Sequence, residues 1–254
     1  MMGKVHFIGA GPGDPELLTI KGKRLLEEAD VIIYAGSLVN PQLLEAAKPG
    51  CSIYDSAGMT LEQVIETMRE AAGGGMSIAR LHTGDPSIYG AIREQIDELD
   101  RLGIECEVVP GVSSFTASAA ALKKEFTLPD ISQTVICTRL EGRTPVPESE
   151  SLESLASHRA SMAIFLSVHM IDEVARRLIP HYGESAPVAI VQKASWSDQK
   201  IVTGTLSNIA KKAREAGIEK TAQILVGEFL GDEYSRSKLY DPDFSHGYRG
   251  GNEK

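Results

Sequence analysis

Short β-branched runs alternate with amphipathic segments along the first half of the chain, and this alternation constrains the fold most strongly. Five runs predict strands: Val5–Ile8, Val31–Tyr34, Ser52–Tyr54, Ser77–Leu81 and Glu105–Val109. The segments between them predict helices: Pro15–Glu28, Asn40–Ala47, Thr60–Ala72 and Ile88–Leu102. In the last segment the apolar side chains recur at helical spacing. Strands that alternate with helices in this way form βαβ units around a parallel sheet.

The second half repeats the alternation with different spacing. Its predicted strands are Thr134–Thr138, Met162–Leu166, Val188–Gln192, Lys200–Gly204 and Gln223–Glu228, and its predicted helices are Ser113–Leu122, Ser149–Ser157, Met170–Ile179 and Leu206–Ala216. Only a short segment without a helix joins the third and fourth of these strands, so that pair is predicted to be antiparallel and the second sheet mixed. We expect an α/β protein with an N-terminal domain over residues 1–123, a C-terminal domain over 124–232 and a tail over 233–254, because charge and Pro129 interrupt the pattern near 123–130.

Charge and composition narrow the class of protein. The 254 residues carry 26 Lys and Arg against 35 Asp and Glu, a formal net charge of −9, which disfavours a nucleic-acid binder. We expect no membrane span and no signal segment, because no apolar run approaches about 18 residues and the N-terminus runs straight into a strand. Three cysteines without C-x-x-C predict free, buried thiols in a reducing cytoplasm. The six histidines form no ligand pattern, so no protein-bound metal is expected.

A glycine-rich cluster, Gly9–Pro15 (G-A-G-P-G-D-P), directly follows the first strand. It departs from the dinucleotide fingerprint G-x-G-x-x-G, because its sixth position is Asp14 and its prolines prevent a helix from starting inside the loop. Asp14 is instead predicted to cap a helix with Pro15 at its first position. The acidic residue of the fingerprint is also missing after the second strand. A nicotinamide or flavin site is therefore disfavoured, although a glycine loop still lets a ligand approach the backbone closely.

Two further glycine turns follow the fourth and fifth strands. They are Thr83–Gly90 (T-G-D-P-S-I-Y-G) and Pro110–Ser114 (P-G-V-S-S). Each turn taken alone can be explained as a capped connection between a strand and a helix. The carboxyl ends of parallel strands share one edge of a sheet, however, and open α/β sheets bind ligands at that edge. The three turns together therefore predict a binding site.

The spacing of these motifs resembles that of the tetrapyrrole methylases, which transfer methyl groups from S-adenosylmethionine to corrin and sirohaem precursors. A fourth segment, Thr138–Glu148, is similar to the T-R-x-x-G-R-T-P-x-P-E stretch of the branch that methylates precorrin-4 at C-11 in cobalamin biosynthesis. The resemblance covers about residues 3–232. It implies two α/β domains with the methyl donor S-adenosyl-L-methionine in a trough between them, and a homodimer.

Carried over motif by motif, the resemblance assigns cofactor contacts in both halves of the chain. They are Pro12, Gly84, Asp85, Ile88, Ser113, Ser114, Leu166, Ser167, Ala194 and Ala222. The family's usual aromatic–Met pair is Leu166-Ser167 here, a departure from its pattern. Asp85 is the predicted catalytic residue, as a base or as the partner of the cofactor's ammonium group, and a purely structural helix cap stays open as an alternative.

The substrate that the family implies is a polycarboxylate tetrapyrrole, whose acetate and propionate groups suit basic side chains. The predicted substrate-binding residues are Arg139, Arg143, Tyr89 and Lys193. Arg80 also lies beside a predicted strand end, His82 is predicted to be a core histidine, and Trp196 is a candidate to cover the cofactor or the substrate. For each basic residue an exposed, solubilising role remains open. Because the net charge is negative, the substrate requires that basic residues gather in the trough.

The implied reaction gives precorrin-5, and the resemblance favours the cobalt-containing substrate over the metal-free one. The sulfonium methyl group is already electrophilic and the reduced pyrrole carbon already nucleophilic, so catalysis needs alignment and exclusion of water above all. Three alternatives stay open. The chain could methylate another tetrapyrrole position or an earlier precursor (uroporphyrinogen III, precorrin-2 or precorrin-3). It could methylate RNA or protein on the same fold, or it could bind a ligand without catalysis.

Overall fold

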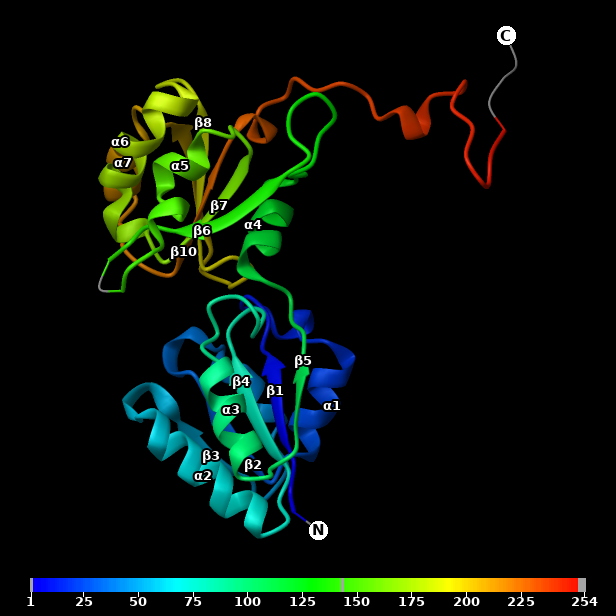
Figure 1. Ribbon diagram of the computed structural model, residues 1–254, viewed down its shortest axis with the longest axis vertical. Coiled ribbons are helices and arrows are strands. Elements are labelled where there is room, and N and C mark those ends of the chain that lie inside the picture. The colour runs from blue at the N-terminus through cyan, green and yellow to red at the C-terminus, as the bar shows by residue number, and fades with distance from the viewer. Residues whose placement is uncertain (1, 143, 251–254) are drawn as a thin grey trace. The chain divides into compact units, whose positions relative to one another are not determined.

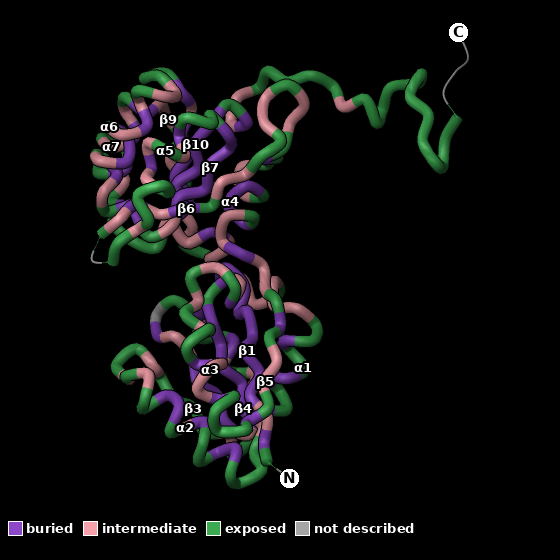
Figure 2. Tube along the Cα trace, viewed as in Figure 1, coloured by how far each residue is buried: buried purple, intermediate pink, exposed green. Residues whose placement is uncertain are grey.

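The computed structural model describes residues 2–142 and 144–250, which form two compact units (Figure 1). The first unit comprises the chain up to Ser118 together with Lys193–Gln199, and the second comprises Ala119–Gln192 and the chain from Lys200 onward. Each unit contains one five-stranded sheet. Buried residues follow both sheets, whereas the segment after residue 232 is largely exposed (Figure 2). No helix in the described ranges is long and apolar enough to cross a membrane.

The first unit is built on a parallel sheet with the strand order β3-β2-β4-β1-β5, as the alternating pattern predicted. Its strands are β1 (Val5–Gly9), β2 (Val31–Tyr34), β3 (Ser52–Asp55), β4 (Ile78–His82) and β5 (Cys106–Val109). Its helices are α1 (Ile20–Glu28), α2 (Leu61–Gly73), α3 (Arg93–Arg101) and the first part of α4 (Ser114–Leu122). One face of the sheet packs on α2 and α3, and the other face packs on α1.

The second unit is built on a mixed sheet with the strand order β6-β7-β10-β8-β9. Its strands are β6 (Val135–Arg139), β7 (Ser161–Phe165), β8 (Pro187–Gln192), β9 (Lys200–Thr205) and β10 (Ala222–Val226). Strands β6 and β7 are parallel, and the other pairs are antiparallel, including β8 with β9 as predicted. Helices α5 (Leu152–Ala156), α6 (Ile171–Tyr182) and α7 (Ile209–Glu215) bury one face of this sheet.

Local capping decides where several helices begin. Helix α2 starts with a capping box: Thr60 Oγ1 accepts from the Gln63 amide at 3.4 Å, and Gln63 Oε1 accepts from the Thr60 amide at 2.8 Å. The helix predicted over Pro15–Glu28 is instead a 3₁₀ turn (Pro15–Leu17) followed by α1, because Thr19 accepts from the Gly22 amide and caps a second start. Asp14 caps the turn as predicted, with its Oδ1 accepting from the Glu16 amide at 2.9 Å.

Three other predicted helices are wrong or too long. The helix predicted from Ile88 begins only at Arg93, because Tyr89 and Ala91 adopt left-handed backbone conformations at φ 55° and 49°. The segment predicted to be helical from Asn40 is a 3₁₀ helix over Pro41–Ala46, and the one predicted over Ser149–Ser157 shortens to α5. The three cysteines are free as predicted, yet Cys51 and Cys106 are only partly buried and Cys137 is exposed.

Candidate functional site

The three glycine turns meet at the carboxyl edge of the first sheet, as the sequence predicted. Gly11 and Gly84, both in the left-handed region, exchange backbone hydrogen bonds of 3.3 and 2.8 Å. A Cβ atom added to Gly111 would lie 2.2 Å from the Gly84 carbonyl oxygen and 2.7 Å from the Gly9 Cα. Only glycine allows the three backbones to approach this closely, so the glycines of the motifs are required by the contact between the turns.

Asp85 connects the second turn to the third. Its Oδ1 accepts from the Ser87 amide at 2.9 Å and from the Ser87 hydroxyl, and its Oδ2 accepts from the Gly111 amide at 2.9 Å. Burial of the carboxyl group raises its pKa, but the hydrogen bonds from Ser87 and Gly111 outweigh burial and hold the pKa below its ordinary value. Asp85 is therefore an ionised group that braces two turns and retains acceptor capacity on Oδ2.

Residues Lys193–Gln199 pack on the first glycine turn, within the first unit. The Trp196 indole Nε1 donates to the Pro12 carbonyl oxygen at 2.8 Å, and the ring lies where a Cβ on Gly13 would stand, with Cδ1 at 2.0 Å. The Asp14 amide donates to Ser195 Oγ at 2.9 Å. Trp196 thus covers the turn itself and holds the carbonyl group of Pro12, while Ala194, another predicted contact, is buried in the same segment.

Lys193 does not present a free ammonium group. Its Nζ pairs with the Asp198 carboxylate and lies 5.4 Å from the centre of the Trp196 ring. A lysine that already has a carboxylate partner contributes less charge to a ligand. The structure therefore makes Lys193 a weaker candidate for substrate binding than its position after β8 implied.

The other predicted contacts of the first unit lie around the same edge. Ser113 is buried and its carbonyl oxygen accepts from the Ala117 amide at the start of α4. Ser114 opens that helix, and its carbonyl oxygen accepts from the Ser118 hydroxyl at 2.7 Å. Ile88 and Tyr89 lie in the second turn, where Tyr89 is 46% exposed. At this exposure the Tyr89 side chain is accessible to a ligand.

In the second unit the predicted contacts also share one edge. Leu166 and Ser167 follow β7, and Ala222 opens β10, whose Ile224 pairs with Ile164 in antiparallel register, so all three residues lie at the same end of the sheet. Leu166 is 63% exposed in a left-handed conformation. Ser167 is fully buried; its Oγ accepts from the Leu140 amide at 2.9 Å and donates to the Phe165 carbonyl oxygen at 2.7 Å.

Arg139 closes the loop that follows β6. Its guanidinium donates to the carbonyl oxygens of Leu140 at 3.4 Å, Thr144 at 3.2 Å and Pro145 at 2.7 Å. These contacts use much of its donor capacity within the loop, so the loop's shape depends on it. Arg143, the other predicted guanidinium, lies outside the described residues.

Sequence reasoning missed two residues that hold the first turn in place. Ser195 contacts Asp14 across 181 positions, and the Asn40 amide group donates to the Gly13 carbonyl oxygen at 2.7 Å. Neither residue belongs to a recognisable motif, and no local pattern indicates contacts over such separations. Their positions become evident only in the tertiary structure, where segments far apart in the chain pack on the first turn.

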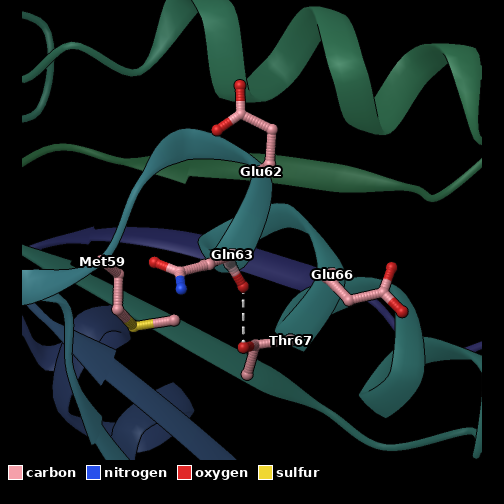
Figure 3. A pocket seen from close by; sticks show the side chains of 5 residues that line it. All are labelled: Met59, Glu62, Gln63, Glu66 and Thr67. Atoms are coloured by element: carbon pink, nitrogen blue, oxygen red, sulfur yellow. Dashed lines mark hydrogen bonds between the residues drawn. The ribbon is translucent and has the colours of Figure 1, made fainter.

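A separate pocket lies on α2, lined by Met59, Glu62, Gln63, Glu66 and Thr67 (Figure 3). There the Thr67 hydroxyl donates to the Gln63 carbonyl oxygen at 2.9 Å. The pocket contains none of the predicted site residues. Across the described residues no group of three or more His, Cys, Asp or Glu side chains is arranged to hold a metal ion.

Comparisons with known proteins find a matching family model and relatives of similar length. A family model described as Tetrapyrrole (Corrin/Porphyrin) Methylases matches residues 4–210. The chain is 60% identical over 253 residues to the cobalt-precorrin-4 C(11)-methyltransferase of Methanocaldococcus jannaschii, covering 99% of this chain and 98% of that protein. It is 50% identical to the precorrin-4 C(11)-methyltransferase of Pseudomonas aeruginosa over 97% of this chain and 99% of that one.

Solved structures agree with the sequence relatives. The X-ray structure of a cobalt precorrin-4 methyltransferase of cobalamin biosynthesis superposes with a TM-score of 0.88 at 48% identity, over 90% of this chain and 96% of that one. The uroporphyrin-III C-methyltransferase of Thermus thermophilus, solved in complex with S-adenosylhomocysteine, superposes with a TM-score of 0.74 at 28% identity, over 90% and 94% of the two chains.

Proposed function

Because this chain belongs to the tetrapyrrole (corrin/porphyrin) methylase family, we propose that it transfers a methyl group from S-adenosyl-L-methionine to C-11 of precorrin-4, giving precorrin-5 in cobalamin biosynthesis. The observation that carries the proposal is the 60% identity, over nearly the whole chain, to an enzyme named for this reaction. That relative is named for cobalt-precorrin-4, so the cobalt-containing macrocycle is the first substrate to test. The cobalt then belongs to the substrate and not to the protein.

The groups at the two sheet edges suit S-adenosyl-L-methionine chemically. When bound, it supplies a sulfonium methyl group that is already electrophilic. In the first unit the backbone around Pro12 and Gly84, with the small side chains of Ser113, Ser114 and Ala194, allows close approach of a ligand. Ile88 in the first unit and Leu166, Ser167 and Ala222 in the second are the remaining proposed contacts. The exposed Leu166 side chain offers an apolar surface of the kind that an adenine ring needs.

Asp85 is proposed as the anionic partner of the cofactor's ammonium group. Its pKa lies below the ordinary value, so the carboxylate is ionised at neutral pH and is a weak proton acceptor. A general base works best when its pKa is near the operating pH, which favours the ammonium partner over the base. Its hydrogen bonds to Ser87 and Gly111 hold the carboxylate in one orientation before the ligand arrives.

The acceptor is proposed to be a polycarboxylate macrocycle that contacts Tyr89, Arg143 and Lys193 and the loop that Arg139 organises. Tyr89 is exposed at the carboxyl edge of the first sheet. Arg139 acts through the loop that it organises, since its donors already bind carbonyl oxygens there. These residues orient the macrocycle, and good orientation of two reactants can lower a barrier by up to about 7–11 kcal/mol.

One experiment tests this function. The purified protein is incubated with methyl-¹³C-labelled S-adenosyl-L-methionine and either cobalt-precorrin-4 or precorrin-4, and the product is examined by mass spectrometry and ¹³C NMR. We expect one labelled methyl group at C-11. A methyl group at a different carbon would overturn the assignment of the position, and the absence of label from both macrocycles would overturn the proposed reaction.

We further propose that the protein works as a homodimer in the cytoplasm. The family resemblance supports the dimer, and the three free cysteines support a reducing compartment. Sedimentation equilibrium at micromolar concentration tests the dimer directly. A monomer at all concentrations would contradict it.

A further inference from the structure

Arg80 is a buried cation on the face of β4 that packs against α2 and α3. The residue is only 6% exposed. Its guanidinium donates from Nε to Gln95 Oε1 at 3.1 Å, and from Nη1 to the Ser56 hydroxyl at 2.9 Å and the Ile33 carbonyl oxygen at 3.4 Å. Ser56 follows the last residue of β3, and Ile33 is next to the last residue of β2. The charge therefore lies just beneath the carboxyl edge of the first sheet.

All three acceptors of Arg80 are neutral. Among the described residues no carboxylate comes within ion-pair distance of the guanidinium, and desolvation by burial lowers its pKa to about 10. Asp55, at the end of β3, accepts from the Ala57 amide at 2.8 Å instead. After β2 the chain reads Tyr34-Ala35-Gly36, without an acid. Proteins almost always pair a buried charge, so a buried arginine with only neutral acceptors lacks the anion that would normally accompany it.

One nitrogen of the guanidinium is left without a partner. Arg80 Nε and Nη1 donate the hydrogen bonds described above, and Nη2 makes none within the described part of the chain. The nearby side chain of His82, on the same strand face, is 4% exposed and its Nε2 is a buried polar atom without a partner. Two polar groups at one strand end are thus left with unused hydrogen-bonding capacity.

We propose that Arg80 binds a carboxylate of the substrate. One acetate or propionate group of the tetrapyrrole then pairs with the guanidinium, in place of the protein carboxylate that a buried arginine normally has. This inference rests on the proposed function, and it names a substrate-binding residue in the first unit. A guanidinium binds a carboxylate through directed, charge-assisted hydrogen bonds, and Nη2 is the donor left for it. Gln95, Ser56 and the Ile33 carbonyl group hold the guanidinium in place, so the site exists before the substrate binds.

Steady-state kinetics with the macrocyclic substrate test this role. We expect Arg80→Gln to raise KM about 30-fold, because it removes one partner of a buried charged pair, and to leave kcat within about threefold of the wild type. Arg80→Lys keeps the charge without the planar fork and should give an intermediate KM. Arg69→Gln is the matched control: it removes an arginine that pairs with Glu66 on the exposed face of α2, and KM should not change. Binding of S-adenosylhomocysteine should be equal in all four proteins.

A purely structural role of Arg80 predicts a different outcome. If Arg80 only fastens β2, β3 and α3 together, Arg80→Gln will lower the melting temperature without changing KM, and the proposal is wrong. If Arg80→Gln does not fold, Arg80→Lys decides: a KM equal to that of the wild type overturns the proposal. If the wild type methylates no macrocycle, the proposed function has failed separately. Equilibrium binding of uroporphyrin III, an octacarboxylate, and of its methyl ester then tests Arg80, and equal effects of Arg80→Lys on both ligands would rule the carboxylate contact out.

Discussion

The carboxylate of Asp85 accepts a hydrogen bond of 2.9 Å from the backbone amide of Gly111, 26 residues further along the chain. This bond joins the turn after β4 to the turn after β5, while the other carboxylate oxygen caps the Ser87 amide. A single side chain thus sets the spacing between two of the three turns that form the proposed cofactor site. Its removal should affect the fold and the ligand together.

We expect Asp85→Ala to lower the free energy of unfolding by about 1–2 kcal/mol, because two backbone donors lose their acceptor. The same variant should weaken binding of S-adenosylhomocysteine at least tenfold, measured by isothermal titration calorimetry. Asp55→Ala is the control, since Asp55 caps the Ala57 amide in a turn outside the proposed contacts. Asp55→Ala should lose about 1 kcal/mol of stability, because one backbone donor loses its acceptor, and should keep its affinity for S-adenosylhomocysteine. If the two variants bind S-adenosylhomocysteine equally well, Asp85 is only a structural cap.

Gly111→Ala should separate the turns. The new Cβ would stand 2.2 Å from the Gly84 carbonyl oxygen, a backbone atom that cannot move without displacing its own turn. We expect a loss of about 2–4 kcal/mol in stability, measured by urea unfolding, with loss of S-adenosylhomocysteine binding. Gly73→Ala, at the end of α2 with no atom within 4 Å of the new Cβ, should be neutral or stabilising by up to about 1 kcal/mol. A wild-type-like Gly111→Ala protein would contradict the close approach of the turns.

Trp196 is the single tryptophan of the chain, so its fluorescence reports on the loop over the first glycine turn. We expect S-adenosylhomocysteine to change the emission with a saturable dependence on concentration, because the indole binds the carbonyl group of Pro12. Trp196→Phe keeps an aromatic ring but loses the Nε1 donor. It should weaken ligand binding by about 1 kcal/mol, or roughly fivefold. If saturating ligand leaves the emission spectrum unchanged, this loop is not part of the cofactor site.

His82 should make the stability of the protein fall in mild acid. Burial, with a contribution from the charge of Arg80, lowers its pKa from 6.5 to about 3 in the folded protein. Between these values the unfolded chain binds the proton and the folded chain does not, so stability decreases as the pH falls below 6.5. At pH 5 the difference amounts to about 2 kcal/mol. His82→Phe should flatten this part of the profile in urea unfolding at pH 7 and pH 5, and parallel profiles would contradict the buried, neutral imidazole.

Arg139→Met should loosen the loop after β6. The substitution removes the hydrogen bonds to the carbonyl oxygens of Thr144 and Pro145, so amide exchange over residues 140–142 and 144–147 should accelerate at least tenfold by mass spectrometry. We also expect KM for the macrocycle to rise severalfold while S-adenosylhomocysteine binding is unchanged. Arg176→Met, at an exposed position on α6, is the control. Unchanged exchange in the loop would show that Arg139 does not organise it.

The strands of both sheets are found where the hydrophobic runs predicted them, within one or two residues at each end. Most of these strands are buried and carry a continuous apolar run, which is a local property of the sequence. Strands β3 and β9 are largely exposed and were predicted from shorter runs of β-branched and aromatic residues. The capping box of Thr60 and Gln63 is likewise a local pattern. The failures lie in the connections. Nothing in the apolar spacing from Ile88 onward indicates that Tyr89 and Ala91 turn into the left-handed region and delay α3.

The sequence by itself determined the alternation of strands and helices, the three glycine turns after β1, β4 and β5, and the family to which they belong. These features depend on neighbours within a few residues, where periodicity and backbone preference act. Tertiary structure alone decided which distant residues meet: the backbones of Gly9 and Gly111, the Trp196 indole and the Pro12 carbonyl group, and Arg80 and its neutral acceptors. Such contacts depend on how the strands are ordered and on how the connections between them pack, and no local pattern determines either, because residues up to 184 positions apart must meet.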